Sequence, residues 1–252
     1  MECSMRKTGL GFKGLALVLA IGAATGVHAD PNEYVVMPKV DVGEKEFDFK
    51  SGVQRNKDGS STMAHSIGVG YGVSSFWFSE VYAKYKREDP QPQAFDAWEW
   101  ENKFQLTRGD KGPLLGILLE IEKPKDSSEG YELTYGPLIQ KDWGKVQYNF
   151  NVLIQRHLNA SAPFQTELHY QAQIKYKAQA PIQWGAQAFG NLGDYKHFSP
   201  TSLQEQKIGP AVFGKVKLSS VEGIKWNAAF LKGITQASPS STIRLQVEYE
   251  YY

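Results

Sequence analysis

Apolar and polar side chains alternate along most of this chain with a period of two residues. Between residues 167 and 176, every second residue is apolar, and Glu, His, Gln and Lys stand between them. The same alternation fills residues 242–251, which lead directly to the C-terminal Tyr252. A period of two is typical of β-strands with one apolar and one polar face.

Runs of this kind recur at similar spacing, and Gly, Asp, Asn, Ser and Pro separate them, as tight reversals require. We predict an all-β chain of about 12 strands, with 10 as the alternative count. The expected strands are 44–54, 61–73, 76–87, 94–106, 113–123, 130–140, 144–156, 165–177, 181–190, 204–218, 223–234 and 242–251. The longest expected loop is 191–203, and the expected turns at the opposite ends of the strands are short.

A soluble periplasmic β-sandwich would show the same alternation, so the alternation alone leaves two architectures open. Aromatic residues near the strand ends favour a transmembrane barrel, because such residues form girdles at the two membrane interfaces. They are Trp77, Tyr131, Trp143, Trp184, Trp226, Tyr249 and Tyr251. We therefore predict an antiparallel up-and-down barrel in which strand 44–54 pairs with strand 242–251.

The N-terminal region predicts export. Arg6, Lys7 and Lys13 precede an uncharged stretch from residue 14 to 27, and Val27-His28-Ala29 offers a small-residue cleavage site. The uncharged stretch is shorter than the roughly 20 residues that a spanning helix needs. We expect residues 1–29 to be a cleaved signal peptide and residues 30–252 to form one domain.

Composition narrows the function classes. The full chain has a net charge of +1, and the expected leader contains three basic residues and one acidic residue, so the remainder is nearly neutral. This argues against nucleic acid as a partner. The single cysteine lies in the expected leader, so disulfides cannot stabilise the exported part.

Together, the leader, the alternating strands, the absence of cysteine after residue 29 and the end Arg244-Leu245-Gln246-Val247-Glu248-Tyr249-Glu250-Tyr251-Tyr252 resemble Gram-negative outer-membrane β-barrel proteins. The resemblance covers residues 30–252. It implies a location in the outer membrane, contact with outer-membrane lipid, and recognition of the last strand by the barrel-assembly machinery. Tyr249, Tyr251 and Tyr252 are the expected assembly signal, although Tyr252 is one residue out of register with the apolar face.

In such a barrel the polar parity of each strand faces the lumen. The predicted lumen-lining residues carry both signs of charge and are Glu46, Asp48, Lys84, Glu99, Glu101, Lys103, Glu120, Glu132, Glu167, His169, Lys175, Lys215, Lys225, Arg244 and Glu248. This lining favours a passive, porin-like channel for small hydrophilic solutes. The alternative is a structural or surface-interaction barrel whose lumen is closed by pairing of these charges.

A lipid-modifying enzyme is the least favoured hypothesis. His65-Ser66 is the only adjacent base and nucleophile pair, and neighbouring strand residues point to opposite faces. We therefore predict no catalytic residues and no enzymatic activity. We also predict no cofactor and no metal site, because His65, His157, His169 and His197 lack ligand spacing. Gly68, Gly70 and Gly72 are expected to mark a bend or a narrowing of the lumen.

Overall fold

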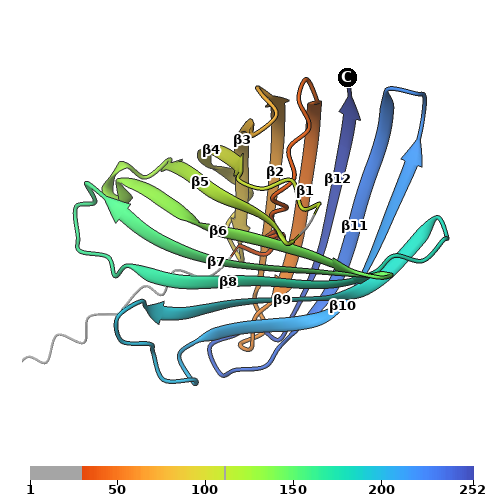
Figure 1. Ribbon diagram of the computed structural model, residues 1–252. Helices are drawn as coiled ribbons and strands as arrows, with labels where there is room; N and C mark the ends of the chain where they lie inside the picture. The colour runs from red at the N-terminus through yellow and green to blue at the C-terminus, as the bar shows by residue number, and fades with distance from the viewer. Residues whose placement is uncertain (1–29, 111) are drawn as a thin grey trace, which may run out of the picture.

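The computed structural model describes residues 30–110 and 112–252, so the expected signal peptide lies outside the described residues. The described residues form twelve strands and one short 3-10 helix, η1 (Ser127–Glu129) (Figure 1). The strands are β1 (Lys45–Arg55), β2 (Ser61–Gly72), β3 (Trp77–Glu88), β4 (Ala94–Gln105), β5 (Leu114–Pro124), β6 (Tyr131–Trp143), β7 (Val146–Leu158), β8 (Glu167–Tyr176), β9 (Ile182–Asp194), β10 (Glu205–Lys217), β11 (Glu222–Gly233) and β12 (Ser241–Tyr251).

The twelve strands close into one antiparallel barrel in which each strand pairs with its neighbours in the chain. Closure is made by β1 and β12, which pair from Lys45 opposite Tyr251 to Arg55 opposite Ser241. The predicted strand count and the predicted pairing of the first and last strands are both confirmed. A closed barrel leaves no open sheet edge, so the strands satisfy one another's main-chain groups without water.

We call the end of the barrel where β1 begins and β12 ends the terminal rim, and the opposite end the far rim. Among the described residues, no helix is long and apolar enough to span a bilayer. β6 and β9 run three to four residues further than predicted, to Trp143 and Asp194. The sequence placed these strand ends in turns because Asp142, Gly144 and Gly193 are turn formers. Ladder pairing with β7 carries β6 through Asp142 to Trp143, and pairing with β8 carries β9 past Gly193 to Asp194.

The alternation in the sequence separates the two faces of the barrel wall. Outward residues are apolar and exposed, as in β2, where Ile67, Val69 and Tyr71 are about half exposed. Inward residues are polar and buried, as Asp48 of β1 and Arg244 of β12 illustrate, each with 2% of its surface exposed. An exposed apolar exterior around a polar interior is suited to hydrocarbon outside the barrel.

Outward aromatic rings gather near the rims, as the sequence predicts. At the terminal rim, Phe47 stacks on Tyr251 with 6.2 Å between ring centroids, and Tyr176 lies 5.2 Å from Trp184. Near the far rim, Phe95 lies 5.4 Å from Trp98. Rings at these levels fit the interfacial belts of a membrane barrel.

Candidate functional site

Residues 30–44 form an extended segment that runs inside the barrel, and we call it the inner segment. It begins towards the far rim, where Asp30 lies 3.0 Å from Lys84, and it reaches the terminal rim, where the Gly43 amide donates to the Gly72 carbonyl at 2.8 Å. Two wall glycines permit the close approach. A β-carbon at residue 52 would lie 2.1 Å from the Pro31 carbonyl oxygen, and one at residue 72 would lie 2.0 Å from that of Asp41. The inner segment therefore spans the lumen lengthwise.

Two adjacent valines connect the inner segment to different parts of the wall. Val35 packs with Phe189, Ala211, Phe213, Ala229 and Leu231, which come from β9, β10 and β11. Val36 packs with Leu118, Leu138 and Leu153, which come from β5, β6 and β7, and Tyr34 lies against this cluster. Both valines are at most 5% exposed. Because successive side chains of an extended chain point in opposite directions, the two valine side chains reach opposite parts of the wall and together cross the lumen.

Hydrogen bonds also hold the inner segment in place next to the two valines. The Val36 amide donates to Gln171 Oε1 at 3.1 Å, and Asn151 Nδ2 donates to the Val36 carbonyl at 2.9 Å. The Tyr34 hydroxyl donates to Glu101. Main-chain groups away from the strands need partners of this kind when they are buried. These partners are wall side chains, in contrast to the main-chain ladder that joins the strands.

One side of the lumen is rich in carboxylates. Lys84 lies among three of them, 2.5 Å from Glu122 and 3.0 Å from both Glu99 and Asp30. Lys50 lies 3.6 Å from Asp48, and its ammonium stands over the rings of Tyr34 and Tyr82. Buried charges need partners at such distances, because their desolvation is otherwise too costly.

The other side of the lumen carries a row of amide side chains. Gln187 donates to Gln173 at 2.6 Å, Gln173 to Asn149 at 3.4 Å, and Asn149 to Gln140 at 3.2 Å. Arg244 on β12 donates to Gln187 and joins this row to the first side. The row crosses β9, β8, β7 and β6, so it is a continuous polar stripe on the inner wall.

A cavity of about 220 Å³ opens at the far rim. Gln54, Ser61, Lys86 and Asp89 contribute to its lining, and Pro31 of the inner segment lines it as well. Ser61 donates to Asp89 from its amide at 3.1 Å and from its hydroxyl. These hydrogen bonds, chiefly that of the hydroxyl, lower the pKa of Asp89, which lies in the connection from β3 to β4. The cavity lies at the far-rim end of the lumen and ends at the start of the inner segment.

The predicted lumen-lining residues lie in two places, inside the barrel and at the terminal rim. Most lie inside the barrel, and Glu46, Asp48, Glu99, Glu101, His169 and Arg244 are buried. Lys215 and Lys225 instead stand at the terminal rim with more exposed side chains, where both pair with Glu250. A role of any of these residues in conduction stays a prediction.

Sequence reasoning missed the inner segment and the apolar clusters that hold it. Tyr34-Val35-Val36-Met37, an apolar run that ends six residues before the first predicted strand, is the sequence signal that points to this segment. The glycines of β2 also have another role than expected. Gly68 and Gly70 face inward, and a β-carbon at residue 68 would lie 2.4 Å from the Tyr82 ring and 2.8 Å from Glu80 Oε1. They make room for β3 side chains.

His65 and Ser66 point to opposite faces of β2. His65 stacks on Phe49 outside the barrel, whereas the Ser66 hydroxyl accepts a hydrogen bond from Asn32 Nδ2 of the inner segment at 2.9 Å. The two side chains therefore do not form a nucleophile and base pair, as the strand parity predicts.

The fold matches solved outer-membrane proteins. An outer membrane channel from Pseudomonas putida F1 superposes with a TM-score of 0.60 at 8% identity, over 89% of this chain and 99% of that chain. The chain has the fold of a Gram-negative outer-membrane β-barrel. The outer-membrane barrel is also similar, at a TM-score of 0.46 and 10% identity, to the translocator domain of autotransporter NalP from Neisseria meningitidis, over 84% of this chain and 89% of that chain. Omp33 of Acinetobacter baumannii has a TM-score of 0.40 at 8% identity, over 83% of this chain and 97% of that chain.

No protein-family model matches the chain, and no curated protein matches it in sequence. The fold supports an outer-membrane location, and function has to be argued from the lumen itself.

Proposed function

We propose that this outer-membrane barrel is a passive channel for small hydrophilic solutes that the inner segment closes in the conformation described here. The observation that carries the proposal is the contrast between the wall and the segment. The wall behind the inner segment carries carboxylates, amides and lysines, which are the residues that line aqueous pores. A lumen built only as a filled core would favour apolar residues, because they pack without needing partners.

The attachment of the inner segment also supports a closed channel. Within residues 31–42, the described contacts to the wall all involve side chains of the wall, with no strand pairing. They are packing, hydrogen bonds, the ion pair of Glu33 with Lys207 at 3.7 Å, and the Lys50 ammonium over the Tyr34 ring. A segment without a main-chain ladder can leave its place without breaking the barrel, because the closed sheet satisfies itself. The channel therefore opens when the segment moves and the barrel stays intact.

Removal of residues 31–42 tests this proposal. The variant keeps Gly43 and Glu44, which bond to Gly72 at the terminal rim, and all twelve strands. In planar bilayers we expect large ohmic steps from the variant and small or rare steps from the wild type. Heat-modifiable gel mobility shows whether the variant is folded. A folded variant without channel events across voltages and salts would overturn the proposal.

A closed structural or surface-interaction barrel is the second candidate. The two buried valines favour it, since they tie the inner segment to β5–β7 and to β9–β11 at once. This candidate predicts that the wild type lets no sugars into liposomes in a swelling assay. It also predicts that loss of the protein weakens the cell envelope. Solute entry through the wild type would exclude it.

We further propose that the last strand directs assembly of the barrel after export by the leader. Tyr249 and Tyr251 stack with Phe47 on the outer face, with centroid separations of 6.5 and 6.2 Å, while Tyr252 turns away. Its hydroxyl donates to Glu44 at 3.4 Å. Burial, followed by the Glu44 carboxylate, raises the pKa of Tyr252 to about 12. Replacement of Tyr251 by Ser should reduce assembly by the isolated assembly machinery, and replacement of Tyr252 should have a smaller effect.

A further inference from the structure

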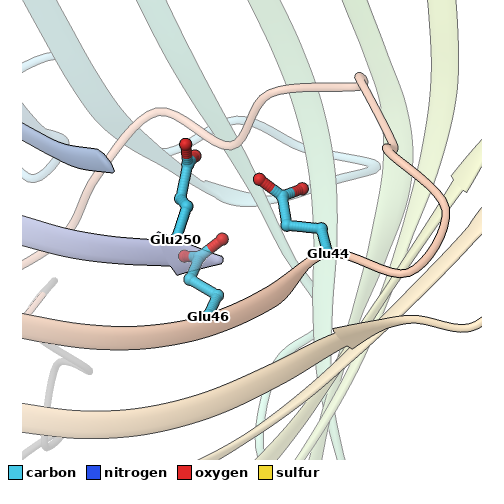
Figure 2. A group of neighbouring side chains, drawn as sticks. All are labelled: Glu44, Glu46 and Glu250. Carbon is cyan, nitrogen blue, oxygen red and sulfur yellow. The ribbon is translucent and has the colours of Figure 1, made fainter. Parts of the chain in front are cut away.

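Five carboxylates gather at the terminal rim of the barrel, and we call them the rim cluster. Glu44, Glu46 and Glu250 each place an oxygen within 4.8 Å of the other two, and Glu46, Asp48 and Glu248 do the same. Figure 2 shows the first three on the chain before β1, on β1 and on β12, with their carboxylates turned toward one another. The two groups share Glu46, so they adjoin each other along the β1–β12 pairing.

The register of barrel closure creates this cluster. Glu46 stands directly opposite Glu250, and Asp48 directly opposite Glu248. Like charges placed directly opposite on paired strands are destabilising. Two such pairs in sequence, with Glu44 added from the inner segment, therefore need positive charge at their centre.

The neighbouring lysines offset only part of this negative charge. Lys225 and Lys215 pair with Glu250, and Lys50 pairs with Asp48. Glu46 is only 8% exposed, and among the described residues it has no hydrogen bond and no ion pair within 4.0 Å. The lysine that acts on it from further away is Lys103, which also faces Glu101, Glu80 and Glu248. The carboxylates around Glu120, by contrast, have a lysine in direct contact, because Lys84 lies 3.0 Å from Glu99 and 2.5 Å from Glu122.

A sixth carboxylate, outside the rim cluster, is directed at it. Glu80 on β3 is 2% exposed, and its Oε1 atom has no hydrogen-bond partner. It lies over two glycines of β2, since a β-carbon would come within 2.8 Å of Glu80 Oε1 at residue 68 and within 3.4 Å of its Cδ at residue 70. Gly68 and Gly70 are the partners of Asp48 and Glu46 in the β1–β2 register. The glycines let Glu80 lie against β2 between the Phe78 and Tyr82 rings, where its carboxylate faces Asp48 and Glu46.

We propose that the rim cluster binds a hard divalent cation of the Ca²⁺ class. Carboxylate oxygens without histidine or cysteine are the ligand set of such ions, whereas zinc and copper favour nitrogen and sulfur. Ligands of Ca²⁺ lie 2.3–2.6 Å from the ion, so two ligands of one ion are at most about 5.2 Å apart. Glu44, Glu46 and Glu250 meet that limit. The ion joins β1, β12 and the end of the inner segment.

Tb³⁺ luminescence and Ca²⁺ titration test the site in the folded full-length protein, purified in a nonionic detergent and stripped with EDTA. Tyr252 donates its hydroxyl to Glu44 at 3.4 Å, so its excitation should sensitise Tb³⁺ bound there. We expect saturable binding of one ion, displacement of Tb³⁺ by Ca²⁺ at lower concentration than by Mg²⁺, and a higher unfolding temperature with Ca²⁺.

Three variants locate the ion. Glu46→Gln and Glu250→Gln should each weaken Ca²⁺ binding at least tenfold. Asp142→Asn removes an exposed rim carboxylate that pairs with Lys177 at 3.1 Å, and it should change binding less than twofold. Heat-modifiable mobility shows whether each variant is folded. Glu46→Gln keeps the size of the side chain and removes a buried charge, so we expect this variant to fold.

The proposal is overturned if the wild type shows no saturable binding, which would mean that protons neutralise the carboxylates. It is also overturned if the folded Glu46→Gln variant binds as the wild type does, or if Glu120→Gln abolishes binding while Glu46→Gln does not. None of these measurements depends on conductance, so they are independent of the proposed channel function.

Discussion

Truncation of the two crossing valines should open the proposed channel. The perturbation is the double substitution Val35→Ala and Val36→Ala, which shortens both side chains and keeps the main chain of the inner segment. Val35 is 5% exposed and Val36 is 2% exposed, so both methyl pairs are lost from buried contacts. The barrel strands themselves are unchanged.

The magnitude follows from the buried surface. Each Val→Ala change removes the equivalent of two methylenes, at about 0.8 kcal/mol each, or about 1.6 kcal/mol per site. The two valines contact different clusters and share no partner, so their effects should add to about 3.2 kcal/mol. Because 1.4 kcal/mol is a factor of ten, the ratio of open to closed channel should rise by about 200-fold.

Single-channel recording in planar bilayers measures that ratio as open probability. Each single variant should raise the ratio about 15-fold, on the same 1.6 kcal/mol. Val42→Ala is the matched control, because it makes the same chemical change in the same segment at a side chain that is 61% exposed. The control should leave the ratio within about twofold of the wild type, as exposed substitutions usually do.

An unchanged open probability in the folded double variant would refute the reasoning if removal of residues 31–42 opens the channel. The valine contacts would then not hold the segment in place. An equal increase from Val42→Ala would refute it as well, because burial would not explain the effect.

Three further predictions concern the contact of Gly52 with the inner segment, the ion pairs of Lys84, and the hydrogen bonds of Asp89. Gly52→Ala places a β-carbon 2.1 Å from the Pro31 carbonyl oxygen, so it should displace the inner segment and raise conductance, whereas Gly112→Ala, with no atom within 4 Å, should not. Lys84→Gln leaves buried carboxylates without their counter-charge and should lower the free energy of unfolding by about 3–5 kcal/mol, measured by urea titration with heat-modifiable mobility; a loss below about 1 kcal/mol would contradict the described pairing. The lowered pKa of Asp89 means that its bond to Ser61 is fully present above the unfolded Asp pKa of about 3.9 and is lost as pH falls through the lower folded value. Hydrogen exchange of the Ser61 amide should therefore accelerate in acid in the wild type, beyond the intrinsic pH dependence, and should show no such step in Asp89→Asn.

The barrel itself could be predicted because its signal is local. Alternation with a period of two sets which face of each strand is buried, and it does so through ten-residue windows such as 167–176. Strand ends depend on partners outside the local window. At Trp143 and Asp194 the pairing with β7 and β8 extends the strands through turn-forming residues. A ladder between strands can override local propensity because each added pair satisfies main-chain groups that a turn would leave to water.

The lumen could be predicted only in part. The inward parity of Glu46, Asp48 and Glu248 follows from the sequence, but their meeting at one site depends on the register of β1 against β12. A shift of that register by two residues would keep every side chain on its face and would still separate Glu46 from Glu250. Parity is therefore a local property, whereas the cluster is a tertiary one.

The sequence by itself determined about twelve strands, each with one apolar and one polar face, because both follow from neighbours along the chain. Closure of the sheet depends on the pairing of β1 with β12, which are far apart in sequence. Only the tertiary structure decided what occupies the interior. Val35 and Val36 carry no periodic signal, and their partners on β5–β7 and β9–β11 lie far away in sequence. Whether a barrel of this size is open or filled depends on those long-range contacts, since they set the free energy that holds the inner segment in the lumen.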